Sequence, residues 1–248
     1  MSPNEPLATS TPLSTRIDPD RPTFIFIVGK KGSGKSVLAR RMWDTWPRDA
    51  VCVDVTADAL RPEDVQETFR GEVPTRWPTP REDAAGDPLP VRIRYVPDAH
   101  SATYQDDLDR SLGLAAINPR SLLWVDEYNI VSRANRTGPY ERHLLVHGRH
   151  DRTSALLCGP RVINIDPLAL AQCDYVYIFE LPGVADRKRI ADTCGIDPAL
   201  LDDAVHALPK GGHDYLRWDG IELVHFPPLP LARPRRSSPR PPTGDGGR

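Results

Sequence analysis

The chain has 248 residues, of which 39% are hydrophobic and 27% charged, as expected for a globular protein of one α/β domain with tails. The formal net charge is −2, so no overall basic surface indicates nucleic-acid binding, and any such contact has to be local or shared among subunits. No apolar run approaches the ~18 residues of a membrane-spanning helix, and the N-terminus lacks the pattern of a signal peptide, so we expect no membrane span.

Proline marks the expected boundaries of the folded part. The 27 prolines are about twice the usual ~5% share, and they gather in residues 1–22, 74–97 and 227–248. We therefore expect disordered tails at 1–21 and 227–248 and one folded domain at 22–226. The C-terminal tail is rich in proline and arginine, a composition that suits a solubilising end or a contact with nucleic acid, an acidic partner or a capsid component.

Apolar runs and helical spacing alternate along the domain. The predicted strands are 23–28, 50–55, 91–96, 121–127, 154–159 and 174–181. The predicted helices are 35–46, 62–69, 104–117, 139–150, 167–172, 184–194 and 197–207. Asp219-Gly220 signals a hairpin with a type I′ turn near the end of the domain. Buried strands that alternate with helices predict an α/β fold with a mostly parallel sheet covered on both faces.

The segment between the first strand and the first helix matches the Walker A pattern, Gly29-x-x-x-x-Gly34-Lys35-Ser36. Its glycines permit a loop whose N–H groups point at an anion, and the helix that follows adds its dipole. Lys35 is expected to reach the β- and γ-phosphates of ATP and Ser36 to bind Mg²⁺. The expected nucleotide-binding residues are Gly29, Lys30, Lys31, Gly32, Ser33, Gly34, Lys35, Ser36 and Val37.

The strand "LLWVDE" ends in two acids, which is the Walker B arrangement. Asp126 would hold Mg²⁺ through water, and Glu127 would act as general base on the attacking water. The acid pair favours hydrolysis over a kinase. At least one strand, 50–55 or 91–96, lies between the two motifs in the chain, which suits the P-loop branch in which an extra strand separates the Walker strands and a glutamate activates water.

Residues 148–181 resemble the FtsK/HerA superfamily of DNA-pumping ATPases, including the genome-packaging ATPases of viruses with an internal membrane. The segment "PLALAQCDYVYIFEL" follows that family's pattern, and the hairpin at 208–220 is similar to its closing strands. The resemblance implies a RecA-like (ASCE) P-loop NTPase fold with a mostly parallel central sheet, helices on both faces and a C-terminal β-hairpin. It also implies a homo-oligomeric ring, a hexamer, in which an arginine finger acts across the subunit interface. Arg149 is the first choice for this arginine and Arg152 the second.

One position departs from that family. Where its members carry a polar sensor, usually glutamine, this chain has Pro160, which offers neither a side-chain donor nor an N–H. Another residue, such as Asn129, Asn164 or Arg161, would then have to detect the γ-phosphate. Otherwise detection of the γ-phosphate would be weak. Weak sensing would make hydrolysis slow or dependent on a partner.

Four other patterns are open to two interpretations each. His143, His147 and His150 lie on one predicted helical face, with a spacing that could hold a metal ion. No cysteine is close in the sequence, so an interface or a solvated surface is the favoured interpretation of this face. The loop with Arg133 and Arg136 suits either DNA phosphates or solvent. Trp43 and Trp46 suit helix packing better than base stacking. The cysteines lack C-x-x-C spacing and are expected to be reduced small hydrophobes: Cys52, Cys158, Cys173 and Cys194.

The sequence thus indicates an ATP- and Mg²⁺-dependent ATPase that moves double-stranded DNA, of the viral packaging type, with a capsid or vertex protein as a further partner. The expected location is the host cytoplasm or the packaging vertex of the virion. Two alternatives stay open: an ATPase of the same core that acts on a protein in phage assembly, extrusion or secretion, and a nucleotide-binding switch with little turnover.

Overall fold

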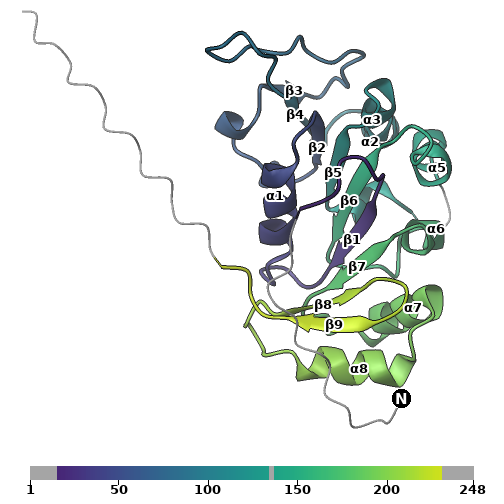
Figure 1. The fold of residues 1–248 in the computed structure, drawn as a ribbon. Helices are drawn as coiled ribbons and strands as arrows, with labels where there is room; N and C mark the ends of the chain where they lie inside the picture. Colours follow the sequence, from purple (N-terminus) through teal and green to yellow (C-terminus); the bar gives the residue numbers. More distant parts are fainter. Residues whose placement is uncertain (1–15, 134–136, 231–248) are drawn as a thin grey trace, which may run out of the picture.

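Nine strands form one sheet in the computed structural model, which describes residues 16–133 and 137–230, in the order β3-β4-β2-β5-β6-β1-β7-β8-β9 (Figure 1). The first seven pair in parallel, and β8 and β9 are antiparallel, which confirms the predicted mixed sheet with a C-terminal hairpin. The strands are β1 (Phe24–Val28), β2 (Ala50–Asp54), β3 (Glu67–Arg70), β4 (Arg92–Val96), β5 (Leu122–Asp126), β6 (Ser154–Gly159), β7 (Tyr175–Ile178), β8 (Tyr215–Trp218) and β9 (Leu223–Phe226).

Helices cover both faces of this sheet (Figure 1). The helices are α1 (Lys35–Thr45), α2 (Tyr104–Leu112), α3 (Leu114–Ile117), α4 (Tyr128–Val131), α5 (Pro139–His147), α6 (Pro167–Ala171), α7 (Val184–Cys194) and α8 (Pro198–Ala207). In β1, Phe24 and Phe26 belong to the core shared with α2, α5 and α7, whereas Ile25 and Ile27 pack with α1. All five residues of β1 are buried because each strand face has its own helical cover.

The buried side of α1 explains the two tryptophans of its sequence. Trp43 and Trp46 are each 2% exposed, and the Trp43 ring lies 5.9 Å from that of Trp124 on β5. The guanidinium of Arg92 covers Trp43 at 5.0 Å from the ring centroid. The pair therefore serves helix packing, as expected, and no face is left for base stacking.

Cysteines behave as small core residues. Cys52 on β2 and Cys158 on β6 are buried, and burial raises the pKa of both thiols well above the usual range. Cys173 and Cys194 are partly buried and, like the other two, free. This fits the expected role of the cysteines as small core residues.

The predicted helix at 62–69 is wrong. Residues 62–64 form a single 3₁₀ turn, and 67–70 form β3, which pairs in parallel with β4. Val65 and Phe69 have helical spacing, but the unpaired edge of β4 offers this segment a ladder of backbone hydrogen bonds, and Phe69 lies opposite Tyr95. Long-range pairing outweighs the local pattern.

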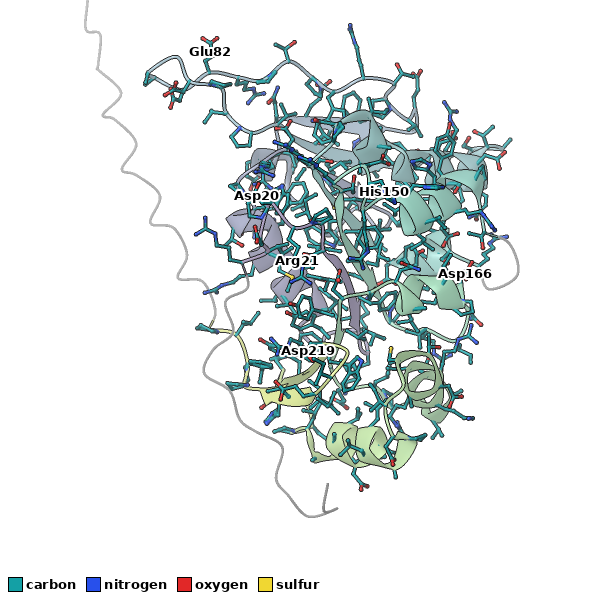
Figure 2. The ribbon with its side chains drawn as sticks, turned by 45° about the vertical axis from the view of Figure 1, so that its right-hand side comes forward. Asp20, Arg21, Glu82, His150, Asp166 and Asp219 are labelled. Carbon is teal, nitrogen blue, oxygen red and sulfur yellow. The ribbon has the colours of Figure 1, made fainter. Side chains whose placement is uncertain are left out.

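Two further expectations need correction. The predicted helix 104–117 is divided at Gly113 into α2 and α3. The hairpin is present, but its loop has four residues, 219–222, because Trp218 pairs with Leu223. Asp219 lacks the positive φ of a type I′ turn and instead accepts hydrogen bonds from the N–H groups of Ile221 and Glu222 at 3.1 and 3.0 Å. Figure 2 labels Asp219 in this yellow hairpin.

Packed chain extends beyond the expected 22–226 at both ends. Ile17 is 6% exposed, and Asp20 pairs with Arg48 at 2.6 Å. At the other end Leu229 packs against the α1 core, and the Pro230 carbonyl accepts a hydrogen bond from Arg41 at 2.8 Å. Residues 16–21 and 227–230, expected in the tails, therefore contact the folded domain. The rest of the expected tails, 1–15 and 231–248, lies outside the described residues. Among the described helices, none is long and apolar enough to cross a membrane.

The proline-rich connection 71–91 forms an arm beyond the β3–β4 edge, with Glu82 far from the sheet (Figure 2). Its tip is a narrow loop. Glu82 and Pro88 form an isolated antiparallel β-bridge there, and the Leu89 N–H donates a hydrogen bond to the Arg81 carbonyl at 2.7 Å. The tip of the arm thus has local order, while Val73 and Val91 near its two ends are buried in the core.

A buried ion pair fixes the end of β2. Asp54 is fully buried and lies 2.8 Å from the guanidinium of Arg94, whose side chain is 3% exposed. The same carboxylate accepts N–H groups of residues 58–60, and Arg94 also donates to the Ala57 carbonyl at 2.6 Å. The turn after β2 therefore depends on one carboxylate.

Replacing Asp54 by alanine is expected to destabilise the fold by about 3–5 kcal/mol, since it leaves a buried guanidinium without its partner. Denaturant unfolding of the purified protein measures this free energy. Asp192→Ala is the matched control, because Asp192 pairs with Lys188 on an exposed helix face, where a pair contributes less than about 1 kcal/mol. Equal midpoints for the two variants would contradict the assigned role of Asp54.

Candidate active site

The Walker A segment forms a loop at the carboxyl end of β1, closely packed against β7. A Cβ atom on Gly29 would lie 2.5 Å from the Cβ of Phe179, so only glycine fits there. Gly34 has φ +109°, a backbone conformation that favours glycine, and α1 begins directly after it. The loop and the free N–H groups of the first helical turn therefore face the same space, as an anion site requires.

Lys35 lies at the centre of this loop. It is 8% exposed, and its Nζ donates to the carbonyl oxygens of Gly29 at 2.6 Å and Lys30 at 3.0 Å. Burial lowers the pKa of Lys35, while the carboxylates of Glu127 and Asp126 act in the opposite direction. The ammonium is thus held within the electrostatic reach of both Walker B acids.

Asp126 and Glu127 reach the same edge of the sheet. Strand β6 lies between β1 and β5, and all three run in parallel, so their carboxyl ends meet there. The extra strand between the Walker strands is therefore present in the sheet. It is β6, whereas β2 and β4 lie between the two motifs along the chain, as expected. Burial, followed by the charges of Glu127 and Asp54, raises the pKa of Asp126 to about 6.

The backbone at Glu127 is unusual. Its φ is +56°, in the left-handed region, and α4 starts at the next residue. The Tyr128 hydroxyl donates to the buried carboxylate of Glu141 on α5 at 2.6 Å. This anchor holds the turn that carries Glu127, so the orientation of Glu127 depends on a helix that the Walker motifs do not include.

Glu180, just after β7, fastens the loop from outside. It accepts Lys30 Nζ at 2.6 Å through one carboxylate oxygen and the Gly211 N–H at 3.2 Å through the other. Its backbone carbonyl also accepts the Lys30 N–H at 2.8 Å. Lys30, expected at the phosphates, thus has its side chain on Glu180, whereas Lys31, Gly32 and Ser36 are exposed and the buried Ser33 hydroxyl has no partner among the described residues.

A cavity of about 440 Å³ adjoins the phosphate loop. Away from Gly32, Gly34, Lys35 and Ser36, its lining comes from α1, from the residue after β7 and from the chain on either side of the hairpin: Val37, Phe179, His213, Pro228 and Leu229. Val37 is 45% exposed, although it follows the motif directly. The space therefore has a polar end at the loop and an apolar end beside it, which matches the two ends of a nucleotide.

Arg149 lies at the opposite edge of the sheet. Its guanidinium donates to Asp174 at 3.0 Å and to the Gln172 carbonyl at 2.7 Å, and it covers the ring of Phe24, the first residue of β1. The phosphate loop follows the last residue of β1, about 13 Å away along the strand. Arg149 thus cannot serve the loop of its own subunit. Arg152, the second choice, is exposed with φ +56°.

The remaining polar expectations are placed as follows. His143 pairs with Asp151 at 2.8 Å and its ring lies 5.2 Å from that of His147, and the described residues contain no cluster of metal-binding side chains. Arg133 donates to Gln105 at 2.7 Å, and Arg136 lies outside the described residues. Arg161 is 3.5 Å from Asp186.

Sequence reasoning missed two residues at this site. Thr56 donates to Asp126 at 3.4 Å from the end of β2, and His213 lies against Gly34 with φ +61°. Thr56 could have been predicted, because polar residues that follow one parallel strand lie at the same edge of the sheet as the carboxyl ends of the other parallel strands. His213 had none, because only the folding of the hairpin segment brings it there.

No protein-family model and no curated protein matches the sequence, but solved structures do. The genome-packaging NTPase B204 of Sulfolobus turreted icosahedral virus 2, with ATP-γS, matches at TM-score 0.63 and 16% identity over 86% of this chain and 99% of that one. The DNA-packaging ATPase B204 of Sulfolobus turreted icosahedral virus matches at TM-score 0.61 and 18% identity, over 85% of this chain and 99% of that one. VirB4 of Thermoanaerobacter pseudethanolicus matches at TM-score 0.57 and 12% identity, over 84% of this chain and 89% of that one. This chain therefore has the fold of these viral packaging NTPases and of VirB4.

Proposed function

We propose that this protein is a Mg²⁺-dependent ATPase that translocates double-stranded DNA during packaging of a viral genome. The observation that carries the proposal is the meeting of Lys35, Asp126 and Glu127 at one edge of a sheet with the packaging-ATPase fold. A Walker lysine within electrostatic reach of two carboxylates, next to a loop shaped for an anion, is suited to phosphoryl transfer to water.

Each side chain has a role in this proposal. The remaining N–H groups of the loop and of the first turn of α1 bind the phosphates, while those of Lys30, Ser33 and Val37 stay bonded to backbone carbonyls. Lys35 leaves its two loop carbonyls for the β- and γ-phosphates. Glu127 accepts the proton of the attacking water. The base and ribose lie in the apolar end of the cavity, between Val37 and Leu229.

The residues present fit Mg²⁺. The ion takes oxygen ligands and uses only one or two protein groups beside phosphates and water, and Ser36 and Asp126 supply one oxygen group each. Burial raises the pKa of Asp126, and the nearby acids Glu127 and Asp54 raise it further. The charge of these acids makes the site negative, which favours a divalent cation. When bound, the ion would offset the negative charge of the phosphates.

Arg149 supports a ring. Because it cannot reach its own nucleotide, a role in hydrolysis requires the nucleotide of a neighbouring subunit, as in a homo-oligomer, of which the hexamer is the proposed form. The DNA contact is local, sequence-independent and made by loops such as the one with Arg133. A capsid or vertex protein is the proposed further partner, in the host cytoplasm or at the virion vertex.

The test is ATP turnover with Mg²⁺, with and without linear double-stranded DNA, with Lys35→Ala as the inactive control. We expect DNA to raise turnover several-fold and single-stranded DNA to raise it less. Turnover that ignores DNA would favour an ATPase acting on a protein partner. Tight ATP binding without turnover would favour the nucleotide-binding switch, the alternative that Pro160 supports.

A further inference from the structure

The end of β6 lacks a polar side chain. Gly159 closes the strand and Pro160 follows it, so neither residue can offer a side-chain hydrogen bond to a nucleotide. This is the strand between the two Walker strands, and its end lies beside both phosphate loop and Walker B acids. An ATPase built on this fold therefore needs another group at that point to distinguish ATP from ADP.

Asn129 fills this place from α4. An ideal Cβ on Gly159 would lie 3.2 Å from Asn129 Oδ1 and 3.7 Å from the Asn129 backbone nitrogen, so the carboxamide occupies the space that a side chain at 159 would take. Asn129 also follows Glu127 by two residues, on the turn anchored by Tyr128. The carboxamide of Asn129 on α4 therefore fills the space left by the missing side chain at the end of β6.

The carboxamide lacks a partner. Asn129 Oδ1 is buried, and no hydrogen bond is made by this side chain among the described residues. A buried polar atom left without a partner costs about 1–3 kcal/mol, and such atoms concentrate where a ligand or water completes the bonding. A carboxamide both donates and accepts, so it can bind a phosphate oxygen through Nδ2 and a water through Oδ1.

The other two candidates lack these features. Arg161 has a side chain that is 63% exposed and is paired with Asp186, and Asn164 is exposed. Neither combines burial, an unpaired hydrogen-bonding atom and contact with the end of β6.

We propose that the Asn129 carboxamide is the γ-phosphate sensor of this protein, in place of a side chain on β6. The inference rests on the proposed ATPase function. Asn129 donates to the γ-phosphate of ATP, accepts from the water that Glu127 activates, and loses both contacts when the phosphate leaves.

The first test compares Asn129→Asp with wild type, because aspartate keeps the size but removes the donor. Loss of one such donor lowers kcat by about 10²–10³-fold in comparable sites. We expect that loss with ADP affinity within about threefold of wild type, and we expect the preference for ATP-γS over ADP to disappear. Asn164→Ala, an exposed asparagine on the next loop, is the matched control and should retain wild-type values.

A second variant leaves Asn129 intact. Gly159→Ala places a methyl group 3.2 Å from Oδ1, so the carboxamide has to shift by a few tenths of an ångström. This variant should therefore weaken the preference for ATP-γS with little change in ADP affinity. Wild-type kcat and wild-type ATP-γS preference in Asn129→Asp would overturn the inference. If the wild-type protein proves to have no turnover, the proposed function fails, and the ratio of ATP-γS to ADP affinity still decides the role of Asn129.

Discussion

Replacing Glu127 by glutamine is expected to lower ATP turnover by about 10²–10⁴-fold, because glutamine keeps the shape of the side chain but cannot accept the proton of the attacking water. Nucleotide affinity should stay within a few-fold of wild type. The phosphate loop and Lys35 are untouched by the change, and the Tyr128–Glu141 contact that positions the turn is retained.

Steady-state turnover and equilibrium binding of ATP-γS measure the two quantities separately. Glu82→Gln, on the arm far from the sheet, is the control of equal chemistry. A variant that hydrolyses ATP at the wild-type rate would exclude Glu127 as the base, and a variant that no longer binds nucleotide would indicate a structural role instead.

Replacing Arg149 by alanine is expected to lower turnover by about 10³–10⁵-fold if the guanidinium stabilises phosphoryl charge in a neighbouring subunit. Arg152→Ala should have a much smaller effect, because Arg152 is exposed and only the second choice. In the subunit itself, Arg149 holds the start of β7 through Asp174, which also accepts the Phe24 N–H at 2.8 Å. A merely structural role would therefore appear in thermal unfolding.

Mixing subunits separates the two roles. We expect Arg149→Ala and Lys35→Ala each to be inactive alone. In the proposed ring, a mixture of the two would contain interfaces where an intact phosphate loop meets an intact Arg149. Recovery of turnover on mixing identifies an arginine that acts between subunits. No recovery, together with a lowered unfolding temperature of Arg149→Ala alone, would assign Arg149 to the stability of β7.

Local patterns predicted the elements that local sequence controls. β6 and α7 have the bounds expected from sequence, since each is an uninterrupted apolar or helical pattern between clear breakers. The Walker loop and the two Walker acids also come from short motifs whose residues have direct chemical reasons. Motif residues and elements with one dominant pattern were thus within reach of the sequence.

Long-range pairing was out of reach. β3 forms because β4 offers a free edge, and the strand between the Walker strands proved to be β6, which follows both motifs in the chain. Asn129 was one of three sensor candidates, and its packing against Gly159 and its buried, unpaired Oδ1 separate it from the other two. Partners such as Arg94 for Asp54 depend in the same way on which strands become neighbours.

The position of β1 in the sheet has a consequence for synthesis of the chain. Its five buried residues pair only with β6 and β7, and β6 ends at Gly159, 131 residues after Val28. At about 5–20 residues per second, the ribosome needs roughly 7–26 s to produce that partner. During this interval the apolar strand next to the phosphate loop has no native neighbour, so the nascent chain depends on chaperones or on transient cover to avoid aggregation.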